Sequence, residues 1–200
     1  ARAGIDQGMR FHAFVSGILL LVACAAKVRA MEPVVVDFEQ VTVLFPGERP
    51  NRVEKFEDKG VIFELAHAPK KSKGKGLVMF FEHSPDKHKG IASAMALEPI
   101  PVRATFPAPV SAVTVTFWGS TGTPVALEAF DRQGRVVSRM SLESAPGRKS
   151  PGDPIPLFPL TVQGEQISYI EFSGPREGEY LAADEVRFTP VGEDPARLHE

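Results

Sequence analysis

Cysteine is almost absent from this sequence. The single cysteine, Cys24, lies in an apolar stretch near the N-terminus. The rest of the chain therefore cannot form a disulfide bond within itself and has no thiolate with which to bind zinc or attack a substrate. An excess of one charge is absent too, since 23 basic residues face 25 acidic ones and the formal net charge is −2. So mild a balance gives no electrostatic reason to bind nucleic acid or an anionic membrane surface.

Polar aromatic residues and helical patterns are also scarce. The chain has one tryptophan and two tyrosines, so it offers few rings on which a sugar could stack. Its 18 prolines and 17 glycines interrupt the sequence at short intervals, and no apolar stripe of helical period competes with them, which excludes long helices. At 200 residues and 43% hydrophobic, the chain is still long enough for one domain with an apolar core.

The first thirty residues have the features of a secretory signal peptide. Met9 begins a short basic head, an uncharged apolar run follows over 13–26, and small residues end it at Ala30. The run is too short to predict a membrane span, and we expect it to be removed. Residues 1–8 have no place in such a signal, so Met9 is the predicted start. The predicted organisation is upstream residues with a signal over 1–30, one domain over 31–190 and a flexible polar tail over 191–200.

Two routes of export fit this signal. An ordinary signal peptidase would cleave after Ala26 or Ala30, which predicts a periplasmic, secreted or cell-surface protein with no membrane span. Alternatively, Leu21-Val22-Ala23-Cys24 resembles a bacterial lipobox, in which the cysteine is lipidated and becomes the first residue of the mature protein. That route predicts a lipoprotein anchored at Cys24.

From residue 34 onward the sequence consists of short segments rich in Val, Ile, Phe and Thr, separated by proline and glycine. This spacing is typical of β-sandwiches. The clearest alternation places Val113, Val115 and Phe117 on one face of a strand. The predicted strands cover 34–39, 41–45, 60–66, 77–82, 91–97, 102–106, 112–118, 124–131, 135–143, 156–162, 167–173 and 183–189. The predicted core comprises Phe63, Phe106, Val113, Val115, Phe117, Phe130, Ile170, Phe172, Val186 and Phe188.

Three connections carry local signals. The segment Ala129–Val136 has turn residues between two apolar runs and predicts a hairpin. Arg52–Lys59 is predicted to form one helical turn that ends at Gly60. Ser144–Pro156 is rich in proline and glycine and is predicted to be an exposed, stiff connection.

Several short motifs follow one another in an order known from exported proteins. They are Val36-Asp37-Phe38-Glu39, Gly60-Val61-Ile62-Phe63, Phe106 to Val113, Leu127 to Asp131, Ile167 to Gly174, and Ala183 to Phe188. This order resembles the sandwich domains of many PEP-CTERM-sorted bacterial proteins and, more distantly, galactose-binding-like jelly rolls and carbohydrate-binding modules. The resemblance implies an all-β, antiparallel β-sandwich of jelly-roll type in a single domain. The sequence lacks the C-terminal apolar helix and arginine cluster of the PEP-CTERM signal, so retention by that route is not expected.

The same resemblance implies a structural calcium ion. In carbohydrate-binding jelly rolls an acidic residue of the first strand often meets one of the last strand at such an ion, and the matching positions here are Glu39, with Asp37, and Asp184. Calcium prefers several carboxylate and carbonyl oxygens, and facing carboxylates are costly to bury without a cation. The alternative is that these residues are exposed or hydrogen-bonded acids at strand ends.

The histidines offer a second metal hypothesis. His67, His83 and His88 lie around a lysine-rich segment, and Glu82 precedes one of them, so imidazole and carboxylate ligands for zinc occur in one region. The spacing matches no known zinc motif, and neighbouring lysines oppose a dication. A solvated loop is therefore the favoured interpretation.

The lysine-rich segment is itself a candidate binding site. Its positive charge would attract a sulfated or uronic polysaccharide, although charge runs also occur as solvated loops. Neither aromatic interleaving nor the spacing of a phosphate-binding loop is present. The candidate residues are Lys70, Lys71, Lys73, Lys75, Lys87 and Lys89.

Two aromatic residues are candidates for stacking on a neutral sugar. Trp118 points away from the face of Phe117 and precedes a glycine-containing rim, although it could equally pack under a loop or in the other half of the core. Tyr169 alternates with Ile170 and shares its predicted face with Glu171.

No catalytic motif is evident. The sequence has no Gly-x-Ser-x-Gly elbow, and a pair of catalytic carboxylates is defined by a separation that sequence does not give. The sequence therefore predicts an exported, non-catalytic binding module whose partner is a polysaccharide. The alternative is a structural or adhesion domain that contacts another cell-envelope protein, and a glycan-acting enzyme is the third interpretation.

Overall fold

Every regular element in the described part of the chain is a β-strand. The structure is a computed structural model, and it describes residues 31–42, 52–70, 78–83, 88–94, 98–119, 122, 124–147, 149–150, 153–173 and 181–191. Over these residues, no helix is long and apolar enough to cross a membrane. The predicted signal, the lipobox cysteine Cys24 and nearly all of the predicted tail lie outside the described residues.

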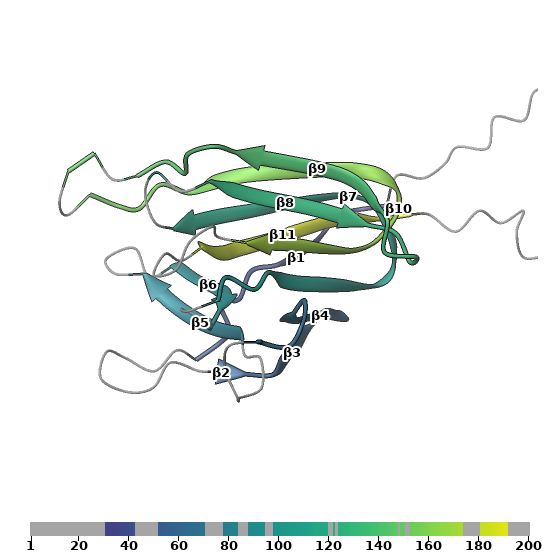
Figure 1. Cartoon of the computed structure of the whole chain (residues 1–200), viewed down its shortest axis with the longest axis horizontal. Coiled ribbons are helices and arrows are strands. Elements are labelled where there is room, and N and C mark those ends of the chain that lie inside the picture. The colour runs from purple at the N-terminus through teal and green to yellow at the C-terminus, as the bar shows by residue number, and fades with distance from the viewer. Residues whose placement is uncertain are drawn as a thin grey trace, which may run out of the picture.

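Two long strands organise the fold. Strand β7 (Val102–Gly119) and strand β10 (Phe158–Ser173) pair antiparallel along most of their length. Their register shifts on both sides of Ile167, opposite the segment of β7 that contains Pro107 and Pro109. Proline has no N–H with which to continue a ladder, so both strands bend there. Figure 1 shows this ribbon curving at one end of the molecule and joining two layers.

Each half of the ribbon is the centre of one sheet. Sheet 1 has the order β2–β5–β6–β11, followed by the second half of β7 and the first half of β10, and β1 pairs with β11. Its other strands are β1 (Val34–Val36), β2 (Arg52–Val53), β5 (Val78–His83), β6 (His88–Ser93) and β11 (Leu181–Pro190). Sheet 2 has the order β3–β4, then the first half of β7 and the second half of β10, then β8–β9. Its other strands are β3 (Lys55–Asp58), β4 (Val61–Leu65), β8 (Val125–Phe130) and β9 (Val136–Leu142).

The core lies between the two sheets. Val113, Val115 and Phe117 are fully buried, as their alternation predicts. Aromatic rings join the layers, because Phe117 of sheet 1 lies 5.4 Å from Phe172 of sheet 2, measured between ring centroids. The predicted antiparallel, all-β sandwich of jelly-roll type is therefore confirmed. Of the predicted core residues, Phe130 is the exception, because it lies on the outer face of β8 while its neighbour Ala129 is buried.

The prediction of a helical turn over Arg52–Lys59 is wrong. Lys55–Asp58 pairs with Val61–Glu64 as a hairpin, and the two residues of its turn, Lys59 and Gly60, both have positive φ, at 50° and 77°. Positive φ at both central residues is the signature of the tight turn that matches the twist of antiparallel strands. Phe56 of this hairpin packs against Phe63 and Phe80, so core contacts override the local helical signal.

The predicted hairpin over Ala129–Val136 is confirmed as β8 and β9. The Asp131 carboxylate accepts the backbone N–H groups of Gln133 and Arg135 at 2.9 and 3.0 Å, and the Nε–H of Arg135 at 2.7 Å. These bonds, chiefly the backbone bond of Arg135, hold the pKa of Asp131 below its usual value of 3.8. The turn is therefore held by one ionised side chain.

Candidate functional site

The outer face of sheet 2 carries a charge row, six charged residues that the strand register aligns across the sheet. The row consists of Lys55, Glu64, Arg103, Glu171, Glu128 and Arg139. Arg103 donates from Nε and Nη2 to Oε1 of Glu171 at 3.0 and 2.6 Å. On the other side of the row, Nε of Arg139 lies 3.6 Å from Oε1 of Glu128. Each of the two central carboxylates is therefore paired with its own arginine.

Tyr169 lies beside this row, on the same outer face as Glu171, but its ring is covered. The ring of Phe130 stacks on it with a centroid distance of 4.7 Å and an interplanar angle of 7°. The guanidinium carbon of Arg103 lies 4.5 Å from the ring centroid. Because β7 and β8 flank β10 on opposite sides, the two groups cover opposite faces of the ring. A sugar cannot stack on either face of Tyr169 in this arrangement.

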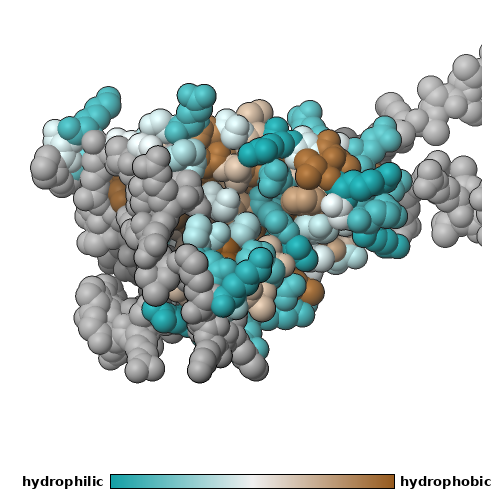
Figure 2. Space-filling model, viewed as in Figure 1, coloured by the Kyte–Doolittle hydropathy of each residue, from teal (hydrophilic) through white to brown (hydrophobic). Residues whose placement is uncertain are grey.

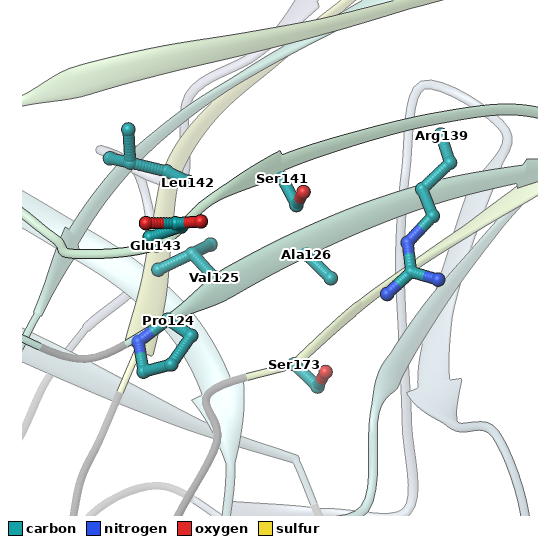
Figure 3. Close-up of a pocket in the computed structure, with 8 residues that line it drawn as sticks. All are labelled: Pro124, Val125, Ala126, Arg139, Ser141, Leu142, Glu143 and Ser173. Atoms are coloured by element: carbon teal, nitrogen blue, oxygen red, sulfur yellow. The ribbon is translucent and has the colours of Figure 1, made fainter.

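Next to the charge row, the serine pocket opens on the outer face of sheet 2. The register aligns Ser173 of β10, Ala126 of β8 and Ser141 of β9, and three small side chains in line leave a hollow. Its cavity volume is about 260 Å³. Figure 3 shows Ala126 between the two serines, with Arg139 at one end of the pocket and Pro124 and Glu143 at the other.

The serine pocket was not predicted from the sequence. Ser141, Ser173 and Ala126 belong to three predicted strands and point outward by simple alternation. What brings them together is the register of β9, β8 and β10, which depends on a bulge between Ala129 and Phe130. A single sequence does not determine such a register.

A second group lies in sheet 1, in a gap at one edge of β11. Strand β1 covers this edge at residues 186–188 and β6 covers it at Ala183, so the edge is open between them. Asp184 is the extra residue of a bulge there, because Ala183 and Glu185 pair with consecutive residues of β7. The junction cluster consists of Asp184, Glu39 after β1, and His88 at the start of β6.

The three side chains of the junction cluster are close enough to share one ion. One ligand atom from each lies within 4.8 Å of the others, and His88 Nδ1 is 3.5 Å from Asp184 Oδ1. In the described part of the chain, this is the one group of three or more such side chains.

Asp184 is the least exposed member of the junction cluster. Its side chain is 14% exposed, and its Oδ1 is buried and accepts no hydrogen bond from any described residue. The pKa of Asp184 is raised from 3.8 to about 6, chiefly by burial; the nearby carboxylates of Glu39, Glu185 and Asp37 act in the same direction, and His88 opposes the shift.

The predicted calcium ligands are brought together in part. Glu39 and Asp184 meet, as the resemblance implies, whereas Oδ1 of Asp37 accepts the backbone N–H of Glu39 at 3.3 Å. His88 takes part instead, and Lys89 Nζ donates to the backbone carbonyl of Glu39 at 2.7 Å. A calcium ion bound by these residues stays a prediction.

Trp118 does not form the exposed platform that was one of its two predicted roles. It is 2% exposed and packs with Ala92 and Ala182, and Ile155 of the 144–156 connection packs against the same cluster. The two alanines leave room for the indole on the outer face of sheet 1, and the connection covers it. Trp118 therefore packs under a loop.

The lysine-rich segment is described only at its ends. Lys70 is exposed and its backbone N–H donates to Glu98 Oε2 at 2.9 Å, and Lys89 contacts Glu39 as described above. Lys71, Lys73, Lys75 and Lys87 lie outside the described residues. Binding of an anionic polysaccharide by these lysines stays a prediction.

No protein-family model and no curated protein matches the sequence. Solved structures with some likeness to the fold include the carbohydrate-binding module TmCBM61 in complex with β-1,4-galactotriose, at 14% identity and a TM-score of 0.40, over 66% of this chain and 89% of that one. A cleaved adhesin domain of Lys-gingipain from Porphyromonas gingivalis has 12% identity and a TM-score of 0.39, over 80% and 99% of the two chains.

A family 6 carbohydrate-binding module has 11% identity and a TM-score of 0.36, over 70% of this chain and 94% of that one. Likenesses at this level show no family and carry no argument about the ligand of this chain. Function must therefore be inferred from the residues of the chain itself.

Proposed function

We propose that this chain is an exported, non-catalytic carbohydrate-binding domain that holds a sugar residue in the serine pocket. The observation that carries the proposal is the composition of this pocket, in which a small apolar floor is bounded by hydroxyl, guanidinium and carboxylate groups. A cavity of about 260 Å³ is small, which suits one polar ring rather than a large cofactor.

The chemistry of a sugar ring matches these groups. A pyranose presents apolar C–H faces and hydroxyl groups that both donate and accept hydrogen bonds. Ala126 and Pro124 supply apolar contact, while Ser141 and Ser173 supply hydroxyls of the same dual character. Arg139 adds N–H donors, and charged donors make the stronger hydrogen bonds.

The charge row supports binding rather than catalysis. Glycoside hydrolysis uses two carboxyl groups that both act on the scissile bond. Glu128 and Glu171 are neighbours across β8 and β10, but each carboxylate is held by an arginine of the same face. The pair therefore links neighbouring strands of the sheet surface.

The test is glycan-array binding of the purified chain, with neutral, sulfated and uronic polymers, at low and physiological salt. Ala126→Leu fills the pocket floor, and we expect it to weaken binding at least about tenfold. Arg139→Ala should weaken binding about tenfold by removing charged donors. The matched control is Arg187→Ala, because Arg187 is also an exposed arginine paired with a glutamate, on β11, and this variant should bind as the wild type does.

Binding to no glycan, or binding that Ala126→Leu leaves unchanged, would contradict the proposal. Binding that is lost at physiological salt and survives Ala126→Leu would instead assign the ligand to the lysine-rich segment, since exposed charge attraction is screened by salt.

A second candidate function is contact with another cell-envelope protein. Strand β9 pairs only with β8 in the strand order, and it exposes Val136, Val137 and Met140. Figure 2 shows hydrophobic surface among polar side chains over β8 and β9. Edge strands with exposed apolar side chains are available for pairing with another chain. If no glycan binds, a protein partner at β9 becomes the leading hypothesis.

A further inference from the structure

We propose that Glu39, His88 and Asp184 form a binding site for a divalent cation that accepts nitrogen as well as oxygen ligands, as Zn²⁺ does. The site lies in sheet 1 and is independent of the proposed sugar pocket in sheet 2. It also differs from the predicted calcium site, because an imidazole takes part in it.

The spacing of the ligand atoms suits a small tetrahedral cation. With zinc–ligand distances of about 2.0–2.2 Å, two ligands of one tetrahedral ion lie about 3.4 Å apart. His88 Nδ1 and Asp184 Oδ1 are already 3.5 Å apart. Glu39 is exposed, so its carboxylate can rotate to close the remaining distance within the 4.8 Å group.

The ligand types favour zinc over calcium. Calcium takes six to eight oxygen ligands, whereas this site offers two carboxylates and one imidazole nitrogen. Two further oxygens are engaged elsewhere, since the Glu39 carbonyl accepts a bond from Lys89 and Oδ1 of Asp37 accepts one from the Glu39 N–H. Imidazole together with carboxylate is a donor set that zinc prefers.

Asp184 supplies an independent argument for a cation. Its Oδ1 is buried and accepts no hydrogen bond from the described residues, although Asp184 carries a charge when ionised. A buried ionised carboxylate is costly unless it is paired or coordinates a metal. The imidazole Nδ1 of His88 is 3.5 Å from this oxygen and does not form a hydrogen bond with it. A cation bound between the two atoms would coordinate both of them.

The surrounding charges favour a dication. The carboxylates of Asp37 and Glu185 are near enough to raise the pKa of Asp184. Among the described residues, the opposing charges are Lys89, whose ammonium group contacts the Glu39 carbonyl, and Arg187, which is paired with Glu185. The described carboxylates of Glu39, Asp184, Asp37 and Glu185 therefore outnumber these two basic groups.

Such an ion would link three segments of the fold. Glu39, His88 and Asp184 come from three segments that are far apart in the sequence and meet where β1 and β6 both border β11. A cation bound to all three links the end of β1 to β6 and β11, and ligand binding to the folded state alone raises stability.

The test is isothermal titration of the full chain, purified without a histidine tag, with Zn²⁺ and separately with Ca²⁺, together with thermal unfolding in each ion. We expect one Zn²⁺ per chain, a higher Tm in Zn²⁺ and no such shift in Ca²⁺. His88→Ala and Asp184→Asn should each weaken Zn²⁺ binding at least about tenfold. We expect both variants to fold, because His88 is partly exposed and Asn has nearly the shape of Asp.

Two controls make the result specific. Glu57→Gln changes an exposed carboxylate on β3, and His67→Ala changes an exposed histidine outside the junction cluster. Both variants should bind Zn²⁺ as the wild type does. The proposal is overturned if no stoichiometric Zn²⁺ binds, if His88→Ala and Asp184→Asn leave binding unchanged, or if Ca²⁺ binds more tightly than Zn²⁺, which would support the calcium prediction instead.

Discussion

Single side chains stabilise the turns of this fold. Asp131 illustrates this, because its carboxylate accepts three N–H groups within one hairpin turn. The sequence shows an aspartate and a glycine between two apolar runs, which is enough to predict the hairpin. The ionised state of that aspartate follows only from the bonds it makes.

We predict that Asp131→Asn lowers the Tm at pH 7 by several degrees, because the amide loses the ion pair with Arg135. The pKa of Asp131 is depressed in the folded state, so its contribution is present above the usual pKa of 3.8 and is lost as pH falls through the folded pKa. Thermal unfolding of wild type and variant from pH 7 to pH 2 should therefore converge at low pH. Glu57→Gln, at an exposed position of β3, is the control. A difference that stays constant with pH would contradict this account.

The outcomes for Trp118 and His88 show the limit of prediction at this scale. Alternation correctly places Trp118 opposite Phe117, but the alanines of β6 and β11 and the residue Ile155 that bury it come from other parts of the chain. The sequence groups His88 with His67 and His83, and His83 does pair with His88 across β5 and β6. Asp184, the carboxylate beside His88, is almost a hundred residues away in sequence, and proximity of that kind is a property of the fold.

At the scale of elements, strand pairing overrides local preference. The hairpin of β3 and β4 replaces a predicted helical turn, because Phe56 gains contacts with Phe63 and Phe80 that a helical turn would not provide. Similarly, the predicted strands 102–106 and 112–118 are two halves of β7, and 156–162 with 167–173 are two halves of β10. The proline and glycine residues that suggested loops mark bends within continuous strands.

Gly60 tests the turn between β3 and β4. We predict that Gly60→Ala destabilises the fold by about 1–2 kcal/mol for the left-handed backbone alone, with a further loss because the new Cβ would lie 3.2 Å from Pro107 Cγ. Gly122→Ala is the matched control, since Gly122 has a φ of 80° and open space around it. Urea unfolding should show the larger loss for Gly60→Ala. Equal losses would mean that the contact with Pro107 has no effect.

Gly90 tests the close approach of β6 to β11. A Cβ at this position would lie 2.8 Å from the backbone oxygen of Ala183 and 3.1 Å from Trp118 Nε1. We predict that Gly90→Ala costs about 1–3 kcal/mol, because β6 must move away from β11. The same movement separates His88 from Asp184, so Zn²⁺ binding should weaken as well. Unchanged stability in urea unfolding would contradict this packing argument.

At the scale of the whole molecule, the bent ribbon of β7 and β10 gives the sandwich two outer faces with different properties. On sheet 1, the junction cluster lies at an edge and Trp118 is covered by a connection. On sheet 2, the register aligns the charge row and the serine pocket on one open face. The sequence was sufficient to predict the two-layer architecture, because alternation is local. Which polar residues share a face and a row depends on the register between strands, and the register is not determined by local sequence.

The most direct test of the proposed function is to map the binding surface. The amide resonances of the isotopically labelled chain would be followed by nuclear magnetic resonance during titration with the oligosaccharide that binds best on the array. We predict that shift changes concentrate at Ala126, Arg139, Ser141 and Ser173 around the serine pocket. Changes confined to Lys70, Lys89 and the segment between them, with the serine pocket unaffected, would contradict the assignment of the sugar to sheet 2.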